Sequence, residues 1–303
     1  MSDLFKTADS VAPQYAFMDV GIALPNAIPG APGSLQLTWA RRAETSGFST
    51  IAALDRVVDP SYDPLTVLAA AAGATSRVRL LTNVLLAPLR APVMLAKEAA
   101  SLDELCGRRL WLGLAPGLRV DDFAAAERGY ADRFRRFDDA LATLQREWTS
   151  ERHDGHDLPV VPEFRRDGGI PLPIGGFSDA AIRRTVARAS GWTAPGLPPS
   201  QVIAFAQRVR TSWAAAGRSG GPRLVALASY SLGDVADTSR SNVRHYYAFL
   251  GETADELAEL VLRVPVAVRD AVAAFRDAGF HELIFNPTVA DIEQLERLRD
   301  VVL

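Results

Sequence analysis

Short apolar runs recur along the chain, and each is followed by a segment whose apolar residues return at helical spacing. The runs are apolar on both faces wherever the pattern is readable, which is typical of strands buried in a parallel sheet. The eight candidate strands cover residues 20–24, 50–54, 79–85, 110–115, 172–176, 192–194, 224–231 and 282–286.

Helices are predicted between these runs, most clearly at 34–46, 64–75, 92–105 and 133–148. The last of these carries an apolar stripe at three- and four-residue steps, made of Phe134, Phe137, Leu141, Leu144 and Trp148. Eight strand–helix units on one core favour an α/β fold with a closed (β/α)8 TIM barrel over an open doubly wound sheet. We expect a loose tail over residues 1–17 and a single barrel domain over 18–303.

Composition and charge narrow the class of protein. A chain of 303 residues that is 48% hydrophobic can bury one large core. The net charge of −3 gives no electrostatic reason to expect nucleic acid or an anionic membrane as a partner. The single Cys106 excludes an internal disulfide, and no apolar run approaches membrane-spanning length. We therefore expect a cytoplasmic protein.

The longest irregular stretch, about 149–169, is rich in Asp, Arg, Gly and Pro. Long connections without structure of their own are often lids, so we expect a lid-like insertion over the barrel before the fifth strand. His153 and His156 lie inside it, but no third metal ligand is spaced nearby. We therefore expect no metal site.

A glycine turn follows that insertion. Residues 172–178 form a short apolar run, then Gly175 and Gly176, then Ser178, which is a suitable N-cap for the next helix. The free N–H groups at such a helix start, next to a turn without side chains, suit a phosphate. A tight strand-to-helix turn with no ligand explains the same residues equally well.

In a TIM barrel the functional residues lie where the strands end. The predicted strand ends are Pro25-Asn26, Asp55-Arg56, Asn83-Val84, Ala115-Pro116, Gly175-Gly176, Ala194-Pro195, Ser229-Tyr230 and Asn286-Pro287. They contain no lysine for Schiff-base chemistry, only one carboxylate, and no serine–histidine arrangement. Such a set suits a protein whose cofactor carries the chemistry.

Several motifs in residues 63–117 resemble the luciferase-like monooxygenase family, whose members are flavin- or deazaflavin-dependent (β/α)8 barrels. The matching pieces are Asp63-Pro64-Leu65-Thr66-Val67-Leu68, Thr82-Asn83-Val84, Leu89-Arg90-Ala91-Pro92, Ala96-Lys97, Leu102-Asp103 and Gly107-Arg108-Arg109-Leu110-Trp111-Leu112-Gly113. Ile174-Gly175-Gly176 and Gly191-Trp192 continue the pattern. The resemblance is clear over roughly residues 20–195, and the order and spacing of the motifs make it specific.

The resemblance implies cofactor contacts for particular residues. Asp55 matches a polar position beside the flavin ring, and Asn83-Val84 matches a non-proline cis peptide that lies against the ring. Ala115 lies in the fourth-strand turn, where the family usually has glycine. The segment near the cofactor phosphate is matched by Gly175, Gly176, Phe177 and Ser178.

Arg56 stands where many family members have histidine. Arginine stays charged near neutral pH and cannot shuttle a proton, so a histidine-type acid–base role does not transfer to it. As a catalytic residue Arg56 would instead supply a fixed positive charge that stabilises the anionic reduced flavin. The alternative is a structural ion pair with Asp55 or Asp59.

The resemblance implies a luciferase-like flavin-dependent monooxygenase that uses reduced FMN and O2 to oxygenate a small organic substrate. One alternative is hydride transfer from the deazaflavin coenzyme F420 without oxygen, and another is a flavin-binding protein that has lost turnover. Family resemblance also implies a homodimer, with a separate flavin reductase as the source of reduced cofactor.

Overall fold

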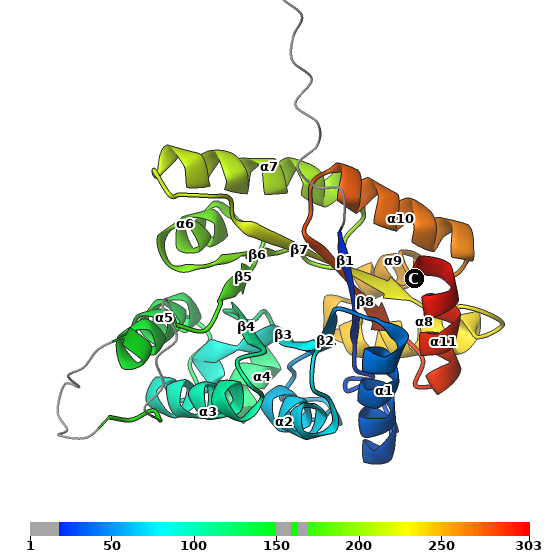
Figure 1. Cartoon of the computed structure of the whole chain (residues 1–303), viewed down its shortest axis with the longest axis horizontal. Coiled ribbons are helices and arrows are strands. Elements are labelled where there is room, and N and C mark those ends of the chain that lie inside the picture. Colours follow the sequence, from blue (N-terminus) through cyan, green and yellow to red (C-terminus); the bar gives the residue numbers. More distant parts are fainter. Residues whose placement is uncertain (1–17, 150–158, 163–168) are drawn as a thin grey trace, which may run out of the picture.

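The structure is a computed structural model that describes residues 18–149, 159–162 and 169–303. Eight parallel strands close into a barrel in chain order (Figure 1), as the sequence predicts. The strands are β1 (Asp19–Ala23), β2 (Thr50–Ala53), β3 (Arg79–Leu86), β4 (Leu110–Ala115), β5 (Pro173–Gly175), β6 (Gly191–Thr193), β7 (Arg223–Tyr230) and β8 (Glu282–Pro287). Each lies within two residues of its predicted span.

Helices surround the barrel (Figure 1) and follow the strands in turn. The outer ring consists of α1 (Gly33–Ser46), α2 (Pro64–Ala74), α3 (Pro92–Leu105), α5 (Arg133–Thr149), α6 (Asp179–Arg188), α7 (Pro199–Ala215), α10 (Pro265–Asp277) and α11 (Ile292–Val302). Additional elements follow β3, β4 and β7, namely η1 (Ala87–Leu89), α4 (Val120–Ala125), α8 (Ala236–Tyr247), η2 (Ala248–Leu250) and α9 (Thr253–Glu259). The described residues include no helix long and apolar enough to cross a membrane.

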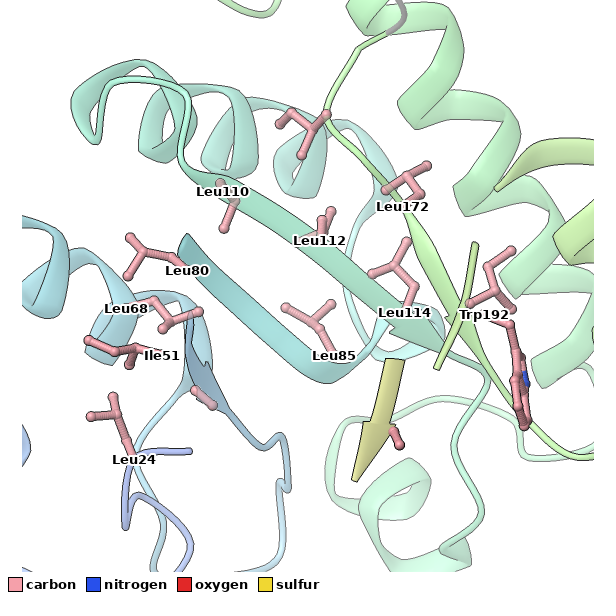
Figure 2. Packing of buried hydrophobic residues seen from close by; sticks show 14 of the residues in the cluster. Leu24, Ile51, Leu68, Leu80, Leu85, Leu110, Leu112, Leu114, Leu172 and Trp192 are labelled. Carbon is pink, nitrogen blue, oxygen red and sulfur yellow. The ribbon is translucent and has the colours of Figure 1, made fainter. Parts of the chain in front are cut away.

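The main core lies between the strands and the outer helices. Figure 2 shows part of it, with Leu80 of β3 near Leu68 of α2 and with Leu110 and Leu112 of β4 in the same cluster. The predicted stripe of α5 faces this core, except that Phe134 in its first turn is exposed. The Arg133 guanidinium lies 4.2 Å from the centre of the Phe134 ring, so this ring packs at the surface.

Charged residues close the amino-terminal end of the barrel. Four strands begin with one: Asp19, Arg79, Arg223 and Glu282. The buried Glu282 carboxylate accepts hydrogen bonds of 2.9 Å from Arg79 Nη1 and from Arg223 Nη2. Its other oxygen accepts from the hydroxyls of Ser49 and Thr50. Because parallel strands all begin at one edge, charges at their first positions meet inside the barrel.

A small apolar layer fills the barrel above these charges. It consists of Ala23, Ala52, Leu81, Val225 and Ile284, with Trp111 and Leu227 packed against it. The lower part of the barrel is therefore closed, and a ligand can enter only at the mouth, where the strands end.

The insertion predicted at 149–169 lies mostly outside the described residues, as do His153 and His156. On its two sides, Thr149 ends α5 and Pro173 begins β5. Helix-to-strand connections in a parallel barrel lie at the edge where strands begin, which is opposite the mouth. The lid itself falls outside the described residues and stays a prediction, while the described elements at the mouth follow β3, β4 and β7.

The Glu44 side chain ties α1 to the start of β3. It accepts hydrogen bonds from the backbone N–H groups of Ser76, Arg77 and Val78. Burial raises the pKa of this carboxyl, but the three bonds outweigh it and lower the pKa from 4.5 to about 2. A carboxyl with a lowered pKa stabilises the fold above its unfolded pKa and stops doing so as pH falls through the folded value.

We expect Glu44→Gln to lower the free energy of unfolding by about 1 kcal/mol at pH 7, because charge-assisted bonds are replaced by weaker ones. The difference from wild type should shrink as pH falls from about 4.5 toward 2. Urea unfolding between pH 7 and pH 3 measures this. A stability difference between wild type and Glu44→Gln that is constant with pH would contradict the lowered pKa of Glu44.

Candidate functional site

Small residues from three strands form one side of the mouth. The Asn83–Val84 peptide bond at the end of β3 is cis, as the family resemblance implies. A Cβ placed on Gly175 would lie 3.3 Å from Val84 Cγ1 and 3.5 Å from Ala115 Cβ. The ends of β3, β4 and β5 are thus in contact, and Val84, Ala115 and Gly175 form a floor of small and medium-sized residues there.

The buried Asn83 amide has one open hydrogen-bonding position at this floor. Its Oδ1 accepts a 2.8 Å hydrogen bond from the Thr193 hydroxyl of β6. Its Nδ2 is buried and has no hydrogen-bond partner among the residues that the structure describes. Buried donors are nearly always paired in folded proteins, so this one is suited to an acceptor on a bound molecule.

The predicted glycine turn follows β5. Ser178 is the N-cap of α6 and its hydroxyl accepts a 3.3 Å bond from the Ala181 amide, as predicted. Gly176 has φ = 124°, and a Cβ there would lie only 3.0 Å from Ala181 Cβ. Glycine is therefore required by the turn itself, so the anion site stays a prediction.

Phe177 lies half exposed beside this turn. Its ring stacks on Phe205 of α7, with ring centres 4.5 Å apart. Trp192 packs against Phe205 in turn and donates a 2.8 Å bond to the Gly176 carbonyl. The rings of Phe177, Phe205 and Trp192 thus pack together beside the turn, and the Phe177 ring is partly exposed to solvent.

Asp55, at the end of β2, binds the protein's own backbone. Its Oδ2 accepts from the Leu86 amide at 2.9 Å and lies 3.5 Å from Arg90 Nη2. Burial raises the pKa of this carboxyl, and Arg90 opposes the shift. Arg90 also pairs with Asp63 at 2.6 Å, which agrees with a structural role for Arg90.

Arg56 connects three elements beside the mouth. Its Nη1 donates a 2.9 Å bond to the Tyr246 carbonyl of α8, and its guanidinium lies 4.3 Å from the centre of the Tyr246 ring. Its Nε lies 3.8 Å from Asp122 Oδ2 in α4. Asp122 Oδ1 in turn accepts from the amides of Val57 and Val58. These contacts fit the structural alternative, with Asp122 as the partner in place of Asp55 or Asp59. The catalytic role stays a prediction.

The bracing role of Arg56 can be measured directly. We expect Arg56→Leu to raise amide hydrogen exchange in residues 236–259 about tenfold or more, because α8 loses a hydrogen bond and a stacked cation. Arg135→Leu is the matched control, since Arg135 is exposed on α5. Equal exchange in both variants would show that Arg56 does not hold α8.

A cavity, here called the mouth cavity, lies on the other side of the barrel mouth. The empty space there is about 490 Å³, a figure that includes space open to solvent. The ends of β1, β2, β7 and β8 and one face of α8 line it, with Leu54, Leu227, Ser229, Tyr246, Tyr247 and Asn286 among the residues. A ligand there would lie beside the floor of small residues.

Helix α8 is not among the helices that the sequence clearly predicts. Only Ser239 and Val243 of this helix are buried, so no apolar stripe marks it. The adjacent tyrosines at its end, Tyr246 and Tyr247, were the available signal. Both line the mouth cavity.

The chain is similar to other proteins along most of its length. The family described as "Luciferase-like monooxygenase" matches residues 18–283. An uncharacterized protein of Mycobacterium bovis, Mb0965c, is 30% identical over 207 residues, covering 59% of this chain and 72% of that protein. A 4-hydroxyprotoasukamycin monooxygenase of Streptomyces nodosus subsp. asukaensis is 27% identical over 300 residues, covering 86% and 78%. Among solved structures, an F420-dependent secondary alcohol dehydrogenase in complex with an F420–acetone adduct aligns with a TM-score of 0.76 at 15% identity, over 94% of this chain and 98% of that one.

Proposed function

We propose that this chain, which belongs to the luciferase-like monooxygenase family, binds reduced FMN and uses O2 to oxygenate a small organic molecule. The relative named as a monooxygenase, which aligns with 86% of this chain, supports this reaction over the alternatives.

The observation that carries the proposal is the unpartnered Asn83 Nδ2 beside the floor formed by Val84, Ala115 and Gly175. A flavin ring is planar and carries acceptor oxygens and nitrogens at its edge. A floor of small and medium-sized residues accommodates the plane, and a buried N–H donor satisfies an acceptor at the edge. The residues present therefore fit the cofactor.

The remaining residues would hold the cofactor and keep water away from it. The turn at Gly175 and Gly176 and the capped start of α6 suit the phosphate. When bound, reduced flavin supplies the electrons that activate O2. The protein's contribution is to position the ring with Asn83 and to exclude water with the apolar wall of α8.

Cofactor titration tests the proposal. Oxidised FMN, reduced FMN under anaerobic conditions and F420 are titrated separately, and binding is followed by cofactor fluorescence or absorbance. We expect FMN to bind and its reduced form to be reoxidised faster by O2 with protein than without. Asn83→Leu should weaken binding of FMN. Binding of F420 with no binding of FMN would favour hydride transfer, and FMN binding without faster reoxidation would favour a binding protein. A separate reductase would supply reduced FMN.

A further inference from the structure

A second cavity, here called the side cavity, adjoins the mouth cavity. It has a volume of about 580 Å³ including open space, and it lies between β7, α8, α9, α10 and the start of α7. Leu227, Ser229, Val243 and Tyr247 line both cavities and form a shared wall. The two cavities are therefore neighbours, and these four side chains lie between them.

No charged side chain is among the described residues that line the two cavities. Their titratable groups are the phenols of Tyr246 and Tyr247, and burial raises the pKa of both. These phenols are therefore uncharged at neutral pH. A charged ligand would lose its hydration here without gaining a counter-charge, which strongly disfavours it.

The side cavity is the more apolar of the two. Its lining includes Leu197, Pro199, Leu257, Leu260, Ala271 and Phe275. Such a lining favours the apolar body of a ligand, because each Å² of apolar surface removed from water contributes about 25 cal/mol of favourable free energy.

The mouth cavity holds one open acceptor. Asn286 of β8 lines it, and the buried Oδ1 of Asn286 accepts no hydrogen bond from any of the described residues. Asn242, which lines the same cavity, differs because its amide donates a 2.9 Å bond to the Thr288 carbonyl. A buried acceptor left open in this cavity favours a molecule that brings a donor.

Two separate halves of the mouth thus carry two separate open groups. Asn83 lies on the half formed by β3–β5, and Asn286 lies on the half formed by β7, β8, β1 and β2. The first offers a donor and the second an acceptor. This separation leaves room for a second molecule beside a cofactor.

We propose that the substrate is an uncharged, mainly apolar molecule with a hydroxyl group that donates to Asn286 Oδ1, and that its apolar body packs against the shared wall of Leu227, Val243 and Tyr247. The inference rests on the proposed function, because that function makes the ligand of these cavities the substrate. An amine would also donate, but its positive charge would have no partner in this lining.

Three matched probes test the proposal by calorimetry without any cofactor: 2-naphthol, naphthalene and 2-naphthoate. We expect 2-naphthol to bind about tenfold more tightly than naphthalene, since a buried acceptor is satisfied. We expect 2-naphthoate to bind at least about 100-fold more weakly than 2-naphthol. Equal affinity for all three would overturn the proposal.

Asn286→Leu should remove the preference for 2-naphthol over naphthalene, while FMN affinity stays within about twofold. Asn83→Leu is the matched control: it should weaken FMN binding and keep the naphthol preference. A naphthol preference that survives Asn286→Leu would overturn the inference even if FMN binds. If FMN fails to bind but the preference depends on Asn286, the proposed function fails and the ligand class stands.

Leu227→Trp is a second variant that does not depend on Asn286. The larger side chain fills the shared wall, and we expect 2-naphthol affinity to fall at least about tenfold. Unchanged naphthol affinity in this variant would show that the probe binds elsewhere and would overturn the proposal.

Discussion

Replacing Gly175 with leucine is expected to lower FMN affinity by about 100-fold or more and to lower the melting temperature of the cofactor-free protein as well. A Cβ at this buried position already lies 3.3 Å from Val84 Cγ1 and 3.5 Å from Ala115 Cβ, so the larger side chain would push apart the floor on which the flavin ring is proposed to lie. Gly175 has no positive φ, so its backbone accepts an L side chain. Gly176 would be a poor test, because its φ of 124° makes any substitution strained.

Fluorescence titration of FMN measures the effect, and thermal unfolding checks the fold. Gly73→Leu is the matched control: this glycine lies in α2, and a Cβ there meets nothing within 4 Å. Gly175→Ala should give a smaller loss, since it adds only one methyl group. If Gly175→Leu binds FMN as wild type does, the ring does not lie over this floor.

Glu282→Ala is expected to lower the free energy of unfolding by about 3–5 kcal/mol, the usual loss when one member of a buried charge cluster is removed. The Glu282 carboxylate is buried and is bound by Arg79 and Arg223. Without it, only Asp19 would face the two guanidinium groups, and Asp19 is partly exposed. The melting temperature should fall by about 10 °C.

Chemical denaturation of the purified protein measures the change. Glu259→Ala is the control, since Glu259 pairs with Arg240 on the exposed surface of α9, where solvent screens the ion pair and its loss should change stability little. Glu282→Gln should fall between wild type and Glu282→Ala, because it keeps the shape and loses the charge. A loss no larger than that of the control would show that the cluster does not stabilise the barrel.

Most of the fold could be predicted from the sequence, because buried parallel strands leave short apolar runs that need no knowledge of their partners. The exceptions are instructive. Phe134 obeys the helical spacing of α5 but is exposed, because periodicity places a residue on a face without saying how far the core extends. The helix α8 was not predicted because only two of its residues, Ser239 and Val243, are buried, which leaves no apolar stripe at helical spacing.

The candidate site was predictable only in part. The strand-end rule placed Asn83, Gly175 and Asn286 at the mouth, and the structure places all three there. It could not show that Asn83 Nδ2 and Asn286 Oδ1 lack partners, since pairing depends on tertiary contacts. The sequence also could not identify Asp122 as the ion-pair partner of Arg56, because Asp122 lies on a separate helix after β4. The homodimer and the flavin reductase stay predictions.

Neighbouring strands of the barrel differ in how many residues they pair. Between β4 and β5 the register contains a single residue pair, Leu114 with Ile174, whereas β8 pairs with β1 from Glu282 to Phe285. The charged cluster also joins β1 and β3 to β7 and β8. The chain between α5 and β5 joins the two strands of this short pairing, and the two halves of the barrel meet again where β8 pairs with β1. Two separately expressed fragments, divided within that connection, would retain nearly all the bonds needed to reassemble the barrel.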